Sequence, residues 1–195
     1  VVDVNFKTDL SVSNEVNKSL INSLENDNVL LYYDLKKGKI GQEEVWLKDK
    51  SEIPINYLKV REGYTNCLVE KDTFGVLRFF QPIVIDRNDT LKHLSIEAAN
   101  LYGSSIKESL IDEKKIMINF SYRYAPSEII NEIKDFEKFK NKIVIVGLFS
   151  KNKNGLPFYN DDIHYTSSNK YYLGKSFPNM YGGEVLATII SNIKN

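Results

Sequence analysis

Three residues in the C-terminal third of the chain carry side chains suited to acid–base or metal chemistry. Asp161, Asp162 and His164 place two carboxylates and an imidazole within four residues. Such a group could hold a divalent cation or share a proton. It could equally contact a ligand or order a loop, or its aspartates could close turns. These alternatives stay open, because the two histidines of the chain do not form a His-x-x-x-His motif.

Three other charged residues could also serve a site. Asp3 lies within an apolar run, where an unpaired buried carboxylate costs on the order of several kcal/mol. Its partner could be Arg78, Arg123, a helix N-terminus or a metal. Arg78 could brace a hairpin or touch a ligand, and Glu184 lies early in the last predicted helix, where it favours the helix dipole. The candidate ligand-binding residues are therefore Asp3, Arg78, Asp161, Asp162, His164 and Glu184.

Several familiar catalytic and cofactor motifs do not fit the sequence. Gly174-Lys175-Ser176 is not a phosphate loop, because Asn169 occupies the position of the required first glycine. No Gly-x-Gly-x-x-Gly follows a strand and no Gly-x-Ser-x-Gly is present. The single cysteine, Cys67, excludes an internal disulfide and a zinc site made of thiolates. We predict no catalytic residue, no metal ligand and no cofactor.

Length and composition predict one globular domain. The chain has 195 residues, of which 42% are apolar, and 26 basic residues balance 26 acidic ones. With no net charge there is no global field to attract nucleic acid. No run approaches the roughly 20 apolar residues that cross a bilayer. The chain begins with Val1 rather than Met, as a soluble piece of a larger protein would.

The segment Asn141–Phe149 predicts the strand around which the fold is organised. Four consecutive branched residues, Ile143 to Val146, favour a central parallel strand buried on both faces. Gly147 then lets the chain leave the sheet. Ligands of open α/β sheets bind at the carboxyl ends of strands, so the long polar loop Leu148–Tyr181 should belong to the site.

The remaining patterns predict an α/β fold with a mostly parallel central sheet, flanked by helices and carrying an inserted antiparallel hairpin. Asp34–Ile55 is predicted to be a surface excursion with a short strand at Val45–Leu47. The other predicted strands are Val1–Phe6, Val29–Tyr33, the hairpin of Gly63–Glu70 with Val76–Ile85, and Lys115–Phe120. The predicted helices are Asn14–Glu25, Leu91–Tyr102, a helix starting near Pro126, and Tyr181–Ile193.

Short motifs are spread over nearly the whole chain, at Val2–Phe6, Gly63–Asn66, Asp72–Arg78, Ile118–Phe120, Lys140–Gly147, Asp161–Thr166 and Met180–Ala187. In order and spacing these motifs resemble those of the CHASE2 domain. Three departures are Leu186 in place of the family's histidine, Thr166-Ser167 in place of Thr-Pro, and the absence of the family's first strand and helix.

The resemblance implies an extracytoplasmic sensory module of a bacterial membrane signalling protein. Membrane helices would flank the module, and a cytoplasmic output domain would follow them. The signal would be a small molecule or a protein, and a homodimer is compatible with the sequence. Two other classes stay open. One is a metal-dependent hydrolase-like enzyme using Asp3, Asp162 and His164, and the other is a pure protein interaction or dimerisation module.

Overall fold

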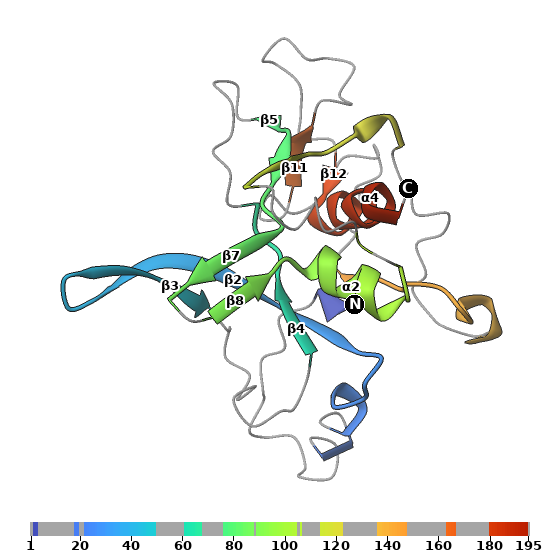
Figure 1. The fold of residues 1–195 in the computed structure, drawn as a ribbon. Helices are drawn as coiled ribbons and strands as arrows, with labels where there is room; N and C mark the ends of the chain where they lie inside the picture. The colour runs from blue at the N-terminus through green and yellow to red at the C-terminus, as the bar shows by residue number, and fades with distance from the viewer. Residues whose placement is uncertain are drawn as a thin grey trace.

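The computed structural model describes residues 2–3, 18–19, 22–49, 61–67, 76–87, 89–104, 106, 114–122, 136–147, 163–166 and 180–194. Within these ranges the chain forms several small sheets and two packed helices (Figure 1). The predicted helix Asn14–Glu25 is described only at 18–19 and 22–24, which are helical. The helix predicted to start near Pro126 is described only at its end, where η3 (Phe136–Phe139) forms a 3-10 turn.

The largest described sheet has five strands, joined in the order β10-β1-β2-β3 with β4 also paired to β2. Its strands are β1 (Val2–Asp3), β2 (Leu30–Ile40), β3 (Glu43–Asp49), β4 (Arg61–Tyr64) and β10 (Val146–Gly147). The pairings β1–β10, β1–β2 and β2–β4 are parallel, whereas β2–β3 is antiparallel. The parallel pairing predicted for the first two strands is therefore confirmed, with Val2 opposite Leu31.

The prediction of a central, doubly buried strand at Ile143–Val146 was wrong for the described sheet. β10 lies at the end of the strand order, with β1 as its neighbour. Ile143 and Ile145 are half-buried against a core cluster, while Val146 is 44% exposed. A run of four branched apolar residues is also compatible with a short edge strand in which one side chain, here Val146, faces water. The run therefore did not by itself specify a central position.

The predicted surface excursion after Asp34 is instead a regular hairpin. β2 continues without a break to Ile40, turns at Gly41, whose φ is +65°, and returns as β3. Figure 1 shows this hairpin projecting from the body of the molecule. We call Lys36–Leu47 the arm. Its lysines and Gly38 are poor strand formers, so its strand structure depends on cross-strand pairing that a local reading does not capture.

The turn of the hairpin predicted around residues 71–75 lies outside the described residues, and the described parts of its two strands pair with other strands. β4 pairs with β2, whereas β5 (Val76–Leu77) pairs with β11 (Ile163–Thr166). β11 pairs in turn with β12 (Met180–Tyr181), and β6 (Phe79–Phe80) pairs with β9 (Ile116–Met117). A tight antiparallel hairpin does follow, formed by β7 (Ile83–Asp86) and β8 (Asp89–Lys92). The described fold is thus mixed α/β, with small sheets and antiparallel hairpins beside the parallel strands.

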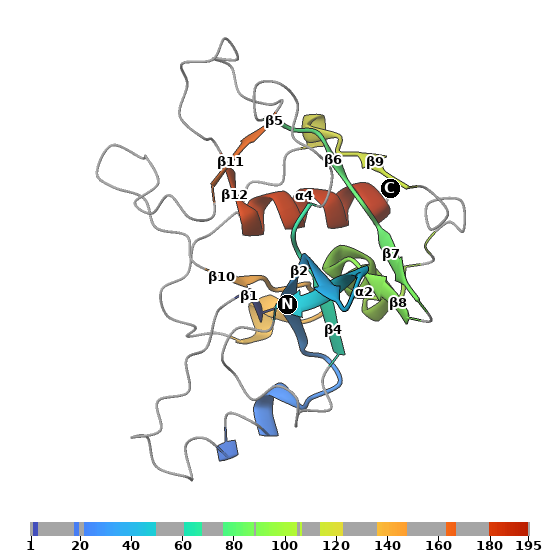
Figure 2. The ribbon, with the colours of Figure 1, turned by 90° about the vertical axis from the view of Figure 1, so that its left-hand side faces the viewer.

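Two helices form the centre of the core. α2 (Leu94–Leu101) begins later than predicted, because Leu91 and Lys92 pair with β7 in β8. α4 (Gly182–Lys194) agrees with the predicted terminal helix. Figure 2 shows α4 between one group of strands, β5, β6, β9, β11 and β12, and a second group containing α2 and the largest sheet.

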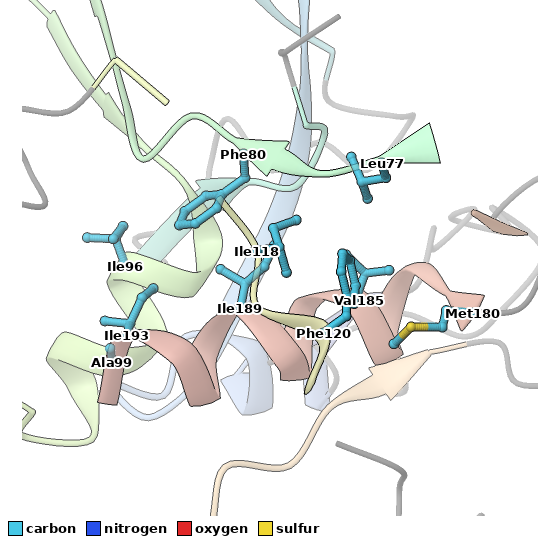
Figure 3. Packing of buried hydrophobic residues seen from close by; sticks show 10 residues of the cluster. All are labelled: Leu77, Phe80, Ile96, Ala99, Ile118, Phe120, Met180, Val185, Ile189 and Ile193. Carbon is cyan, nitrogen blue, oxygen red and sulfur yellow. The ribbon is translucent and has the colours of Figure 1, made fainter. Parts of the chain in front are cut away.

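Two stripes on α4 bury against two apolar clusters. Val185, Ile189 and Ile193 pack with Phe80 and Ile118 (Figure 3). The neighbouring stripe, Leu186 and Ile190, packs with Leu30, Leu94 and Ala98. Burial of each such side chain contributes roughly 1.5–3 kcal/mol, so packing rather than helix propensity holds α4 in place.

Candidate functional site

The carboxyl ends of the parallel strands meet at one edge of the largest sheet. Asp3 is paired with Gly147, and the neighbouring strand passes from Tyr33 to Asp34 at the same edge. The next strand ends at Tyr64. We call this region the carboxyl edge. Edges of this kind are where open α/β sheets bind ligands, since the loops that leave the strands can surround a molecule there.

Side chains just beyond the strands fix this edge. The amide of Asn66 acts as an extra strand residue, because its Nδ2 donates to the Leu35 carbonyl at 2.7 Å and its Oδ1 accepts from the Leu35 N–H at 2.9 Å. Thr65 donates its hydroxyl proton to Asp34 Oδ1 at 3.2 Å, and its N–H to the Tyr33 carbonyl at 3.2 Å. The carboxyl edge is therefore preorganised where the end of β4 meets the middle of β2.

The end of β4 also holds the start of α2. Gly63 makes this possible, because a Cβ there would lie 2.7 Å from the Leu94 Cα. Tyr64 forms an isolated parallel bridge with His93, the N-cap of α2. We call Gly63–Thr65 together with His93–Ser95 the β4–α2 junction.

His93 is fully buried within this junction. Its Nδ1 accepts from the Ser95 N–H at 3.2 Å and lies 2.8 Å from the Ser95 hydroxyl, while its Nε2 lies 3.3 Å from the Thr65 carbonyl. Tyr64 and Phe80 contact the ring at centroid distances of 5.2 and 5.1 Å. Burial lowers the pKa of His93 to about 4, although the hydrogen bond to Thr65 opposes this shift. The ring is therefore neutral at pH 7.

The aromatic groups beside His93 are also kept neutral. Burial raises the pKa of Tyr64 far above its usual range, and the phenol donates to the Gln81 carbonyl at 2.7 Å. Burial likewise raises the pKa of Tyr33, with a smaller contribution from the negative charge of Glu62. The side chains of Tyr64 and His93 in the junction are thus hydrogen-bonded but uncharged.

The start of α4 is fixed by Glu184. This residue is buried, and its carboxylate accepts from the Tyr181 N–H at 2.9 Å, as the third residue of a capping box does. Burial and the charge of Glu184 raise the pKa of Tyr181. The helix-terminal role expected for Glu184 is therefore the one its contacts show.

The end of α4 is fixed from two sides. The amide of Asn192 accepts from the Asn119 N–H at 2.6 Å and donates to the Asn119 carbonyl at 3.2 Å. Lys194 places its ammonium 3.7 Å from the centroid of the Tyr102 ring, and the Tyr102 hydroxyl donates to the Asn141 carbonyl at 3.0 Å. The last turn of α4 is thereby linked to the end of β9, the end of α2 and the approach to β10.

A model of the CHASE2 domain family matches residues 1–195. The chain belongs to the CHASE2 domain family. CHASE2 domains are extracytoplasmic sensory domains of signalling proteins and are typically non-catalytic. No curated protein and no solved structure matches the chain.

The CHASE2 motifs have physical roles in the described residues. Gly63 admits α2, and Asn66 clamps β2 to β4. The backbone N–H of Asn119 donates to the Asn192 side chain of α4 and its carbonyl accepts from that side chain, while Glu184 caps the start of the helix. The motifs that carry the resemblance therefore hold the parallel strands and the two helices together.

The structure places the predicted site residues in different parts of this CHASE2 domain. Asp3 lies at the carboxyl edge, and Arg78 is half-buried between β5 and β6, where its carbonyl accepts from Ile118 at 2.8 Å. His164 lies in β11, opposite Met180, in a different sheet from Asp3. Asp161 and Asp162 lie outside the described residues. The spatial arrangement of Asp161 and Asp162 around His164 therefore stays a prediction.

In the ranges that the structure covers, no three His, Cys, Asp or Glu side chains lie close enough together to hold a metal ion. Over the same ranges, no helix has the length and apolarity required to cross a membrane.

The sequence reasoning missed His93 and Asn66 as residues that organise the site. Asn66 belongs to the Gly63–Asn66 motif, so its recurrence in the family pattern was an available signal. His93 had a weaker one. It stands where the strand pattern of β8 changes to the helical pattern of α2, which is the place of an N-cap, although histidine is not a common residue there.

Proposed function

We propose that this CHASE2 chain is the single sensory domain, spanning residues 1–195, of a membrane-anchored bacterial signalling protein. It would bind a small molecule or a protein signal and catalyse no reaction itself. The observation that carries the proposal is the family match along the full chain. Membrane helices would flank the domain, and the output domain would lie on the cytoplasmic side.

The proposed signal site is the carboxyl edge of the parallel strands. We infer that these strands form the central part of the fold. Asp3 lies there by its pairing with Gly147, and Asp34 is held nearby by Thr65. Asp161, Asp162 and His164 remain predicted ligand contacts, although the described His164 lies in β11, in a different sheet from Asp3. Arg78 and Glu184 remain predicted contacts, and the described role of Glu184 as a helix cap supports an indirect contribution.

The proposed route of the signal is α4. This helix packs against both apolar clusters, and hydrogen bonds to other elements fix its two ends. A helix held in this way moves only when its partners move, so occupancy of the carboxyl edge could favour one of two positions. A coupling of about 1–3 kcal/mol between the site and the helix would be sufficient.

Cysteine labelling tests the extracytoplasmic location. In the full-length protein with Cys67→Ala, we expect Ile40→Cys to react with a membrane-impermeant maleimide on cells whose cytoplasmic membrane is intact, because Ile40 is 56% exposed. Val84→Cys is the matched control, since this side chain is buried and should label only after unfolding. Labelling of Ile40→Cys only after the cytoplasmic membrane is broken would refute the location.

Loosening the end of α4 tests the signal route. Asn192→Ala removes both hydrogen bonds to Asn119, so we expect the basal activity of the output domain in the full-length protein to change. Asn100→Ala is the control, because Asn100 is an exposed residue of α2. An output unchanged by Asn192→Ala, in a protein that still folds, would contradict transmission through α4.

A further inference from the structure

The start of α2 depends on a side chain that can change its charge. N-caps are commonly Ser, Thr, Asp or Asn, whose side-chain oxygens accept from the first amides of the helix. In α2 this acceptor is the Nδ1 atom of His93, which receives the Ser95 N–H. The His93 carbonyl also accepts from Ile96 at 2.9 Å. A proton on Nδ1 would therefore remove a helix cap.

The hydrogen bonds of His93 fit one neutral form of the ring. Nδ1 must be unprotonated to accept from Ser95, and Nε2 must carry the proton to donate to the Thr65 carbonyl. A second proton would place an N–H on Nδ1 facing the Ser95 N–H. The Ser95 hydroxyl could turn to accept it, but the Ser95 amide, which is buried, would lose its acceptor.

The surroundings of His93 offer no compensation for a positive charge. From β4 and β6 the ring meets Tyr64 and Phe80, and Tyr33 of β2 lies behind Tyr64 with a ring centroid distance of 6.5 Å. The neighbouring charges are already paired. Lys92 contacts Glu97 at 3.2 Å, and Glu184 of α4 accepts from the Tyr181 N–H. Among the described residues, no carboxylate hydrogen-bonds to the ring.

We propose that His93 is a proton-operated latch, whose protonation detaches the start of α2 from β4 and so makes this sensory domain respond to acid. The response would reach α4, because Leu94 and Ala98 of α2 pack directly against Leu186 and Ile190. This inference rests on the proposed sensory function for its biological meaning. Its physical part, the coupling of proton uptake to opening of the β4–α2 junction, belongs to the domain alone.

The sign and range of the effect follow from linkage. Because burial lowers the pKa of His93 from 6.5 to about 4, the open state takes up a proton at a higher pH than the closed state. The stabilisation is complete above about pH 6.5 and is lost as the pH falls towards 4. For this single group, the equilibrium constant for opening should rise roughly 30-fold between pH 7.5 and pH 5.

Stability measured against pH tests the latch in the complete chain. Urea unfolding followed by the fluorescence of Trp46, the single tryptophan, should give a steeper loss of stability on acidification in the wild type than in His93→Asn. Asparagine can cap a helix but does not titrate in this range. The ratio of unfolding constants at pH 5 and pH 7.5 should differ about 30-fold between the two proteins. His164→Asn controls for the other histidine, and equal ratios in the wild type and His93→Asn would overturn the proposal.

A direct measurement covers the case in which His93→Asn does not fold. In the wild type, NMR of the His93 ring should show the Nε2–H form persisting below pH 5, with faster exchange of the Ser95 amide, corrected for intrinsic rate, as acid opens the junction. Titration near pH 6.5 with an unchanged Ser95 amide would refute the latch. The labelling of Ile40→Cys and the output of Asn192→Ala are independent of this result, so failure of the latch would not be mistaken for failure of the sensory function.

Discussion

The strand β2 belongs to two regions that are stabilised in opposite ways. Its first half lies beside the β4–α2 junction, where Leu30 and Leu31 are buried and Asn66 hydrogen-bonds to both backbone groups of Leu35. Its second half is one of the two strands of the arm, where Ile40 of β2 is 56% and Leu47 of β3 43% exposed. A single strand can therefore carry both a rigid centre and a projecting surface, depending only on which elements pack against it.

The difference lies in how many elements contribute to each region. The junction combines hydrogen bonds and ring contacts from β2, β4, β6 and α2. The arm is held mainly by its own two strands, with Lys37 placed 5.5 Å from the Trp46 ring. Two contacts come from outside the arm. The Asp86 carboxylate of β7 accepts from the backbone N–H of Trp46 at 3.4 Å, and the Arg87 guanidinium lies 4.0 Å from the Glu43 carboxylate. Such exposed ion pairs add little, so we expect changes in the core and the junction to alter stability far more than changes in the arm.

The largest contrast should come from the core between the helices and strands. Ile189→Ala leaves a cavity among Phe80, Ile118 and Val185, so we expect a loss of about 3–4 kcal/mol in the free energy of unfolding (Figure 3). Leu47→Ala in the arm is the matched control and should cost less than about 1 kcal/mol. Urea unfolding measures both. Comparable losses would mean that the arm is as tightly packed as the core.

The two glycines with crowded Cβ positions give the next contrast. Gly63→Ala forces a Cβ against the Leu94 backbone at 2.7 Å, which cannot move without shifting α2, so we expect a cost of about 2–3 kcal/mol. Gly38→Ala also meets a neighbour, at the Leu47 side chain, but that side chain is flexible and partly exposed. Its cost should stay below about 1 kcal/mol. The comparison fails if thermal or urea unfolding finds the two substitutions equal.

The smallest contrast concerns a single side-chain amide. Asn66→Ala removes both hydrogen bonds to Leu35, and we expect a loss of about 1–2 kcal/mol because the two backbone groups are only partly accessible to water. Asn100→Ala, on the exposed side of α2, should change stability by less than about 0.5 kcal/mol. Hydrogen exchange of the Leu35 amide provides a local readout. If its protection survives Asn66→Ala, the amide of Asn66 is not what closes the strand pair.

Periodic and motif-bearing segments were predictable from the sequence. The stripe of α4 and the parallel pairing of β1 with β2 follow from local patterns that the structure confirms. The family was recognisable because some of its motif residues, such as Gly63 and Asn66, make contacts that few other residues can make. The arm was not predicted because its residues do not by themselves favour strand structure.

Which site residues come together could be predicted only in part. Asp3 was expected inside the strand Val1–Phe6, whereas in the described residues it is the last residue of β1, at the carboxyl edge. His93 drew no attention, because its importance comes from Thr65, Tyr64 and Phe80, which the fold brings from separate strands. Burial creates its low pKa, and burial is a property of the neighbours rather than of the residue.

The sequence by itself determined the elements whose own residues repeat with a clear period, and the glycine, Gly63, at which strand and helix touch. Only the tertiary structure decided that β10 lies at the edge of the described sheet, that β2 extends into an arm, and that the buried ring of His93 caps α2. The reason is physical. Periodicity records which face of an element is apolar, whereas strand order and the protonation of a buried ring depend on partners distant in the chain.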